Sequence, residues 1–166
     1  MLVKVYGSKS PRLKALLHNA VKFAALKLMS KRLCNSLEIS VKFDKALMKN
    51  DGAVAQVEWV DNNYKARIFE ITLDRNQSAF LQILSIMHEM VHIKQYAKGE
   101  LMQSMKNCKD HKWQKVWVDD SKINYYDLPW EIEAHGREKG MTLEWLRKTD
   151  LMTETEKEAW RDKFLF

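Results

Sequence analysis

The fold of this 166-residue chain is decided by residues 77–99, which read QSAFLQILSIMHEMVHIKQYAKG. Residues 77–97 contain no proline or glycine, and the apolar residues recur every three or four positions, as on one face of a helix. These apolar residues are Phe80, Leu81, Ile83, Leu84, Ile86, Met87 and Val91. Asn76 or Ser78 can cap the start of the helix, and Gly99 can end it. We therefore predict a helix with a broad buried face.

Residues 88–92 of that helix read His-Glu-Met-Val-His, an H-E-x-x-H motif. His88 and His92 are four residues apart, so both imidazoles lie on one helix face and can reach one metal ion. Glu89 is turned by about 100° around the axis, where it can polarise a metal-held water without being a ligand. A catalytic zinc takes three protein ligands and keeps one open position. The motif predicts two ligands and a general base; the alternative is a pair of structural histidines.

The composition restricts the class of protein. Apolar residues make up 46% of the chain, and the six tryptophans are incompatible with general disorder. The length predicts one compact domain, residues 1–166. No apolar run approaches the roughly 20 residues that a membrane-spanning helix needs, and the N-terminus does not resemble a secretory signal. Cys34 and Cys108 lack the spacing of metal ligands, so we expect free thiols in a cytoplasmic protein.

The net charge of +6 is unevenly distributed. Residues 1–50 hold 11 Lys and Arg against two acidic residues, whereas the rest of the chain is slightly acidic. A basic first third could face nucleic acid. However, Lys14, Lys22 and Lys31 interleave with apolar positions, and no aromatic residues stand among them as stacking platforms. These features favour the solvated face of an amphipathic helix.

The remaining elements follow from periodicity and turn residues. Strands are predicted at 2–6, 37–43, 53–60 and 64–73, with a turn at 50–52 and a hairpin connection at 61–63. Helices are predicted at 11–33, at 129–139 with a break at Gly140, and at 153–163, while 99–127 reads as an aromatic-rich loop. The order predicts an α+β fold. In it, the N-terminal helix and a small twisted sheet pack on the motif helix, and a ligand-bearing helix follows.

The third ligand is sought in residues 128–138, LPWEIEAHGRE. Pro129 can begin a helix, which places Glu131 in the first turn, where the helix dipole favours an ionised carboxylate. Ala134 is small enough for this helix to approach the motif helix closely. His135 is four residues after Glu131 and shares its face, so it could contact the reacting oxygen. Glu131 is favoured, and the alternatives are His111, Glu133 and His135.

Two family resemblances accompany these residues. His88-Glu89-Met90-Val91-His92 with the later Glu131-x-x-Ala134 resembles the gluzincins, in which a Glu from an E-x-x-A-D helix completes the zinc site; His135 stands where that pattern has Asp. Residues 88–96, H-E-M-V-H-x-K-Q-Y, with the later residues 129–134, P-W-E-I-E-A, also resemble small metallopeptidase-like proteins of tailed phages and bacteria. This resemblance covers residues 80–140 and implies a zincin-like fold, a zinc ion and peptide hydrolysis.

The second resemblance is to SprT-like proteases, whose third ligand is a His followed by an aromatic residue. Residues 110–113, Asp-His-Lys-Trp, resemble that pattern with a shortened spacing. This resemblance implies His111 as the third ligand and a protein substrate bound to DNA, which would give the basic first third a purpose.

The expected activity is zinc-dependent cleavage of a peptide or protein by a metal-activated water. His88, His92 and Glu131 would bind the ion, and Glu89 would act as general base. His135 would stabilise the developing oxyanion, with Tyr125 or Tyr126 as alternatives. We expect residues 64–73 to offer the strand edge for an extended substrate. The rival hypotheses are a nucleic-acid-associated binding module with a non-catalytic metal, and a hydrolase acting on a non-peptide bond.

Overall fold

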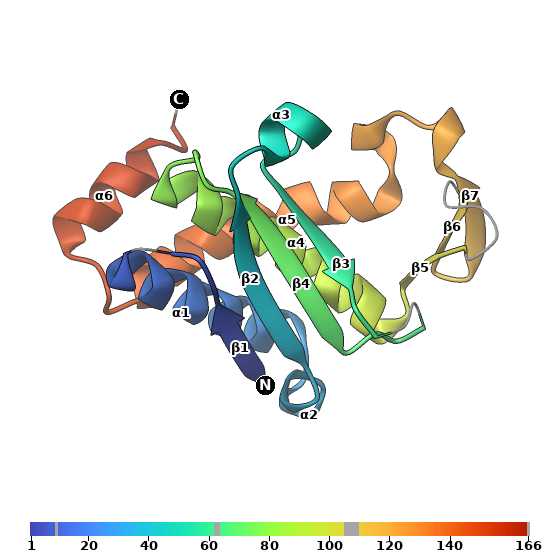
Figure 1. Ribbon diagram of the computed structural model, residues 1–166, viewed down its shortest axis with the longest axis horizontal. Coiled ribbons are helices and arrows are strands. Elements are labelled where there is room, and N and C mark those ends of the chain that lie inside the picture. The colour runs from blue at the N-terminus through green and yellow to red at the C-terminus, as the bar shows by residue number, and fades with distance from the viewer. Residues whose placement is uncertain (9, 62–63, 105–109, 166) are drawn as a thin grey trace.

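The computed structural model describes residues 1–8, 10–61, 64–104 and 110–165. The described residues contain a four-stranded sheet with the order β1-β2-β4-β3 (Figure 1). Its strands are β1 (Leu2–Val5), β2 (Glu38–Asp44), β3 (Ala55–Trp59) and β4 (Ile68–Asp74). β1, β2 and β4 run parallel, and β3 pairs antiparallel with β4 at one edge. The mixed arrangement of helices and strands confirms the α+β class.

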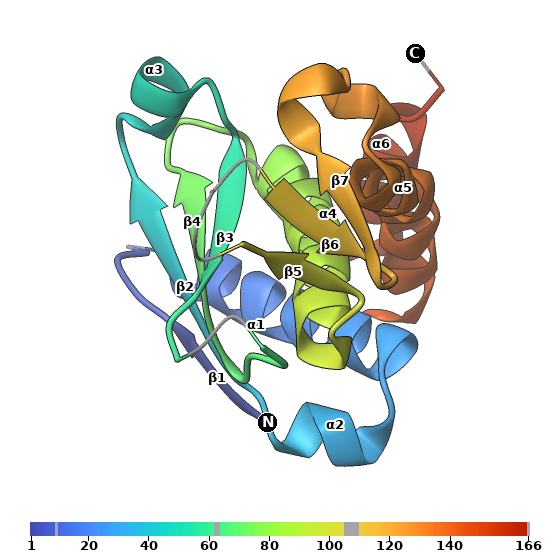
Figure 2. The same ribbon diagram turned by 90° about the vertical axis from the view of Figure 1, so that its right-hand side faces the viewer.

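The helices are α1 (Pro11–Leu28), α2 (Lys31–Asn35), α3 (Leu47–Asp51), α4 (Ala79–Lys98), α5 (Pro129–Lys148) and α6 (Glu154–Asp162). The long helices α1, α4 and α5 form two layers on one side of this sheet, whereas the short α3 lies beyond the end of the sheet (Figure 2). α1 and α4 pack next to the sheet, and α5 packs on the far side of α4. Between α4 and α5 the chain forms the small antiparallel sheet β5 (Leu101–Gln103), β6 (Asp110–Trp113) and β7 (Val116–Asp119). The motif helix α4 is thus at the centre of the molecule.

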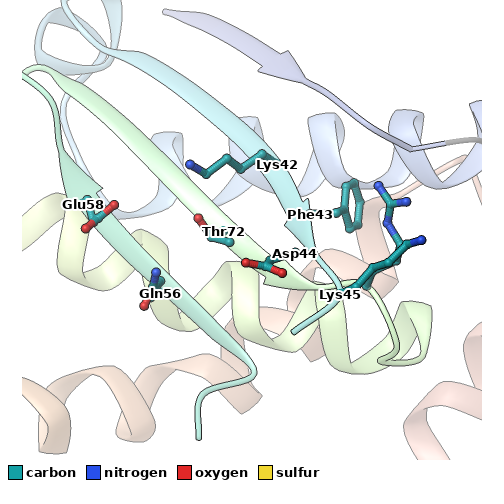
Figure 3. Close-up of a pocket in the computed structure, with 8 residues that line it drawn as sticks. Lys42, Phe43, Asp44, Lys45, Gln56, Glu58 and Thr72 are labelled. Carbon is teal, nitrogen blue, oxygen red and sulfur yellow. The ribbon is translucent and has the colours of Figure 1, made fainter. Parts of the chain in front are cut away.

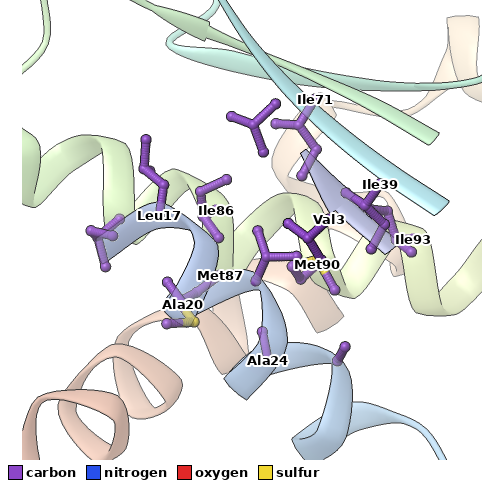
Figure 4. Close-up of a cluster of buried hydrophobic side chains, with 14 of the residues drawn as sticks. Val3, Leu17, Ala20, Ala24, Ile39, Ile71, Ile86, Met87, Met90 and Ile93 are labelled. Carbon is purple, nitrogen blue, oxygen red and sulfur yellow. The ribbon is translucent and has the colours of Figure 1, made fainter. Parts of the chain in front are cut away.

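The main core fills the space between the sheet, α1 and α4 (Figure 4). Alternation along the strands turns Ile39 and Ile71 inward, where both side chains are fully buried. They belong to the same buried cluster as Leu17 of α1 and Met90 of α4, which are also fully buried. Since burying one such side chain contributes about 1.5–3 kcal/mol, this core fixes α4 firmly against the sheet.

The prediction for α4 is confirmed, including its ends. The Ser78 hydroxyl accepts a hydrogen bond from the Leu81 backbone N–H at 3.3 Å, as an N-cap does. Gly99 ends the helix in the left-handed conformation with φ of 71°. The strands predicted at 53–60 and 64–73 also pair as expected, with Ala55 opposite Leu73. Asn62 and Asn63 of the predicted connection lie outside the described residues.

The predicted helix over 11–33 is wrong at its C-terminal end. α1 stops at Leu28 because Met29 is extended, and a new short helix, α2, begins after Ser30. The Ser30 side chain accepts from the Leu33 N–H at 3.3 Å, so a second N-cap interrupts a continuous apolar period. The turn at 50–52 is confirmed by Gly52, with φ of 68°, but it ends a helical segment, α3, that the sequence did not reveal.

Two further predictions are corrected. The loop predicted at 99–127 contains β5, β6 and β7, whose strands are too short to show clear alternation. The β6–β7 turn uses Gln114 and Lys115 at positive φ, so the usual Gly and Asn signals of a hairpin are missing. α5 runs without a break through Gly136 and Gly140, because packing against α4 outweighs the weak helix propensity of glycine.

The prediction that residues 64–73 form the strand edge is wrong. β4 is an interior strand, hydrogen-bonded to β2 on one side and β3 on the other. In the described residues the edge strand on the side of the motif is β3. No helix in the described part of the chain combines the length and apolar character that crossing a membrane requires. Cys34 is a free, buried thiol, and Cys108 lies outside the described residues.

Candidate metal site

α4 and α5 bring three predicted ligands together. The two helices pack side by side, and Ala134 is fully buried in α5. His88 and His92 project from consecutive turns of α4, and Glu131 projects from the first turn of α5. Each of the three is less than a tenth exposed. One imidazole nitrogen from each histidine and a carboxylate oxygen of Glu131 all lie within 4.8 Å of one another.

The donor atoms have the spacing that a small metal ion requires. The two Nε2 atoms of His88 and His92 are 3.1 Å apart. Glu131 places Oε2 at 3.3 Å from Nε2 of His88 and Oε1 at 3.4 Å from Nε2 of His92. Ligand atoms about 2.0–2.1 Å from a tetrahedral zinc ion stand about 3.3 Å from each other. The set of two imidazoles and one carboxylate therefore fits zinc with a fourth position open.

Two residues that sequence reasoning missed orient the histidines. His88 Nδ1 lies 2.8 Å from Oε2 of Glu138, and His92 Nδ1 lies 2.8 Å from Oε1 of Gln95. An acceptor at Nδ1 holds the proton there and leaves Nε2 free for a metal. Gln95 is itself held because its amide donates to the Trp130 carbonyl at 3.0 Å. Glu138 follows Glu131 by two helical turns, so the two residues share one face of the helix. This spacing was the signal in the sequence from which Glu138 could have been found.

Charges at the site reinforce one another. Burial works against charge on His88, but hydrogen bonds to Glu131 and Glu138 outweigh it and raise the pKa of His88 to about 10. His92 is desolvated too, and its contact with Glu131 still raises its pKa. Burial also opposes ionisation of Glu131, yet both histidines and Tyr125 hold its pKa well below the ordinary value. Glu131 is therefore an ionised candidate ligand whose charge attracts positive charge, whether from protons or from a metal ion.

Glu89 has the environment of a proton acceptor. It is 6% exposed, and burial is the main cause of a raised pKa, which the neighbouring histidines only partly offset. The nearby carboxylates Glu131 and Glu138 raise this pKa further. A carboxylate whose pKa moves toward neutrality is a better general base than an exposed one. Glu89 lines the same cavity as His88, so this group can be reached from outside.

His135 and Tyr125 lie beside the candidate cluster, and their predicted contact with a reacting oxygen stays a prediction. The His135 ring stands 4.5 Å from the His88 ring, and its Nδ1 is 3.3 Å from Glu138. His88, His135 and Glu138 also have metal-binding spacing, but this second grouping shares His88 with the first. The Tyr125 hydroxyl donates to Oε2 of Glu131 at 2.7 Å. Tyr125 thus holds the carboxylate of the candidate ligand Glu131.

The other third-ligand candidates lie apart from this cluster. His111 is on β6, with Nδ1 3.1 Å from Oδ2 of Asp120 and its ring 5.0 Å from the Trp130 ring. Burial lowers the pKa of His111 despite the nearby Asp120. Glu133 accepts from Lys94 at 2.7 Å and from Gln95 at 3.1 Å. Among the described residues, neither His111 nor Glu133 joins a grouping with metal-binding spacing.

A cavity of about 510 Å³ opens beside the metal-binding cluster, and we call it the His88 cavity. It is lined by residues 52–55, by Leu81, Leu84, Ser85, His88 and Glu89 of α4, by Tyr125 and Tyr126, and by His135 and Glu138 of α5. A separate hollow lies on the polar outer face of the main sheet, where Lys42, Gln56, Glu58 and Thr72 gather (Figure 3). None of the three candidate ligands lines that hollow.

The positive charge of residues 1–50 is partly compensated by acidic side chains. Ion pairs join Lys4 to Glu38, Arg12 to Glu156, Lys27 to Glu144 and Lys42 to Glu70. Lys14 and Lys22 lie exposed on α1, as the amphipathic interpretation expects. A nucleic-acid partner for this surface stays a prediction.

Comparisons of the chain with models of known protein families, with curated protein sequences and with solved structures return no match.

Proposed function

We propose that this protein is a zinc-dependent hydrolase that cleaves peptide bonds, with His88, His92 and Glu131 as ligands and Glu89 as general base. The observation that carries the proposal is the convergence of the two imidazole Nε2 atoms and the Glu131 carboxylate, with Nε2–Nε2 and Nε2–oxygen separations of 3.1–3.4 Å. These groups stand beside a buried carboxylate with a raised pKa. Two imidazoles and a carboxylate are a known ligand set of catalytic zinc sites.

The residues of the chain divide the chemistry between them. A bound zinc ion supplies positive charge for the developing oxyanion and makes water easier to deprotonate. Glu89 accepts the proton of the attacking water and returns it to the leaving nitrogen. The raised pKa of Glu89 suits both steps. Glu138 and Gln95 hold the two imidazoles, and Tyr125 holds the Glu131 carboxylate.

The outer edge of β3, with which no other described strand pairs, supports a peptide as substrate. Val54 accepts from Asp74, and Val60 donates to Ile68, so these alternate residues bond toward β4. In an antiparallel ladder the intervening residues turn their N–H and C=O groups the other way. Ala55 and Val57 therefore offer backbone donors and acceptors on the outer edge, and Ala55 also lines the His88 cavity. An extended peptide can add to this edge beside the metal ligands.

The test is to replace Glu89 by Gln in the zinc-loaded protein and to measure cleavage of a peptide library. We expect the variant to retain one zinc per chain and to lose at least about 100-fold in rate, as loss of a general base predicts. Glu144→Gln on the surface of α5 is the matched control and should leave the rate unchanged. Full activity of the Glu89→Gln variant with zinc bound would disprove the role of Glu89.

A further inference from the structure

The His88 cavity has two chemically different ends. At one end stand His88, Glu89, His135 and Glu138, which belong to the metal-binding cluster or touch it. The other end is built from residues 52–55 before and within β3, and from Leu81, Leu84 and Ser85 of α4. Among the residues that the structure describes, no lysine, arginine or aspartate lines the cavity. Within this described lining, charge is confined to the end where the bond would be cut.

The uncharged end presents large apolar side chains to an open space. Leu81 is 39% exposed and Val54 is 38% exposed, although both adjoin the buried core elements α4 and β3. Tyr125 and Tyr126 also line the cavity, with ring centres 5.2 Å apart, and their rings stand 6.2 and 5.5 Å from the His135 ring. Aliphatic and aromatic walls around a cavity of about 510 Å³ form a surface that loses water favourably when an apolar group enters.

This wall is rigidly held. Asp74 is 1% exposed, and its backbone N–H donates to the Val54 carbonyl at 2.9 Å. Its carboxylate accepts from the Met48 N–H at 3.2 Å, and its carbonyl accepts from the Gln82 amide at 3.1 Å. One buried residue thus ties the start of β3 to α3 and to the first turn of α4. A wall fixed in this way discriminates by shape, because it does not rearrange to suit each side chain.

We propose that the His88 cavity selects peptides with a large apolar side chain next to the bond that is cut, with Leu81 and Val54 as specificity-determining residues. This inference rests on the proposed peptide hydrolysis and adds the class of substrate. A charged side chain would lose its hydration at the uncharged end without gaining a partner of opposite charge. Leucine or phenylalanine would cover the exposed parts of Leu81 and Val54.

The experiment digests a peptide library with the zinc-loaded full chain and then compares matched peptides carrying Leu, Ala or Lys at the selected position. We expect kcat/KM for Leu to exceed that for Lys by at least tenfold and that for Ala by about 10- to 200-fold. Leu81→Ala should reduce the ratio of Leu to Ala, and Leu81→Glu should reduce the ratio of Leu to Lys by tenfold or more.

The substitutions at Leu81 are chosen to preserve the fold. Leu81 is three residues after the N-cap Ser78, where Glu completes a capping box. Zinc content of each variant checks that the metal site is intact. Leu26→Glu is the matched control, because Leu26 is 60% exposed on α1 and does not line the cavity. This control should keep the wild-type preference.

Each result decides one question. Cleavage by the wild type without preference for apolar residues overturns the specificity inference and leaves the proposed function standing. An unchanged ratio of Leu to Lys in the zinc-loaded Leu81→Glu variant also overturns it. The proposed function is overturned if the wild type shows no zinc-dependent cleavage, or if its cleavage persists in the Glu89→Gln variant. The specificity inference then fails as well.

Discussion

His88 Nδ1 lies 2.8 Å from Oε2 of Glu138, so the first histidine of the motif is oriented by a carboxylate from the facing helix. Glu138 lies two helical periods after Glu131, and α5 therefore supplies both a proposed ligand and the residue that orients another proposed ligand. The gluzincin-like pattern places this second carboxylate four residues after the ligand Glu, where this chain has His135. In this structure the carboxylate that contacts Nδ1 of a motif histidine is Glu138, about one turn after His135.

Replacing Glu138 by Ala should weaken zinc binding about 10- to 100-fold, because an unsupported imidazole can rotate and is less basic. Competition with a chromogenic chelator measures this affinity directly. Glu144→Ala on the same helix should change it little, since Glu144 contacts Lys27 and Lys148 and lies away from the histidines. Equal affinities for the Glu138 variant and the wild type would exclude an orienting role.

The identity of the third ligand is tested by Glu131→Ala and His111→Ala. Removing Glu131 leaves two ligands and should abolish stoichiometric zinc, whereas removing His111 from β6 should leave zinc content unchanged. Metal analysis after gel filtration gives the stoichiometry, and circular dichroism checks that both variants fold. Loss of zinc from the His111 variant alone would favour the SprT-like arrangement.

Ala134 is fully buried in α5, the helix that packs against α4. Ala134→Leu should destabilise the protein by about 1–3 kcal/mol through overpacking and should lower zinc affinity by moving Glu131. Gly140→Ala should instead stabilise the protein by about 0.5–1 kcal/mol, because alanine has the higher helix propensity. Nothing lies within 4 Å of the added Cβ, so the substitution causes no clash. Urea unfolding of the metal-free variants measures both changes. A neutral Ala134→Leu would mean that the helices do not meet closely at this point.

The predictable part of the structure is the part with long, regular periods. α4 could be predicted together with both ends, because residues 78–99 combine an N-cap, an uninterrupted apolar face and a terminal glycine. Glu131 could be chosen over His111 because Pro129 placed it in a first helical turn. Neither choice required knowledge of the tertiary fold.

What could not be predicted depends on contacts between distant segments. The order of the strands decides that β3 is the edge, and no local pattern encodes that order. Gln95 orients His92 only because α5 brings the Trp130 carbonyl to its amide. The β6–β7 hairpin turns at Gln114 and Lys115, which carry no turn signal of their own. In each case, tertiary packing selects among local structures that the sequence leaves nearly equivalent.

Glu144 should give the fold an acid-sensitive contact. Hydrogen bonds from Lys148 and Lys27 lower the pKa of Glu144 to about 2, and these contacts tie α5 to α1. Because the folded-state pKa lies below the unfolded value, the contribution is complete above about pH 4.5 and is lost as the pH falls toward 2. A carboxyl titration by NMR should show the low pKa, and Glu144→Gln should remove this part of the acid dependence. A normal pKa at Glu144 would contradict the contact.

Zinc binding should release protons and strengthen as the pH rises. Glu131 and Glu138 raise the pKa of His88 to about 10, so this imidazole is charged at neutral pH when no metal is bound. A metal needs the neutral form, and binding near pH 7 must therefore displace at least one proton. Calorimetry in buffers of different ionisation enthalpy measures the number released. Glu138→Gln removes one cause of the raised pKa and should reduce the proton release at the same pH. Zinc binding with no proton release at pH 7 would show that both imidazoles are already neutral.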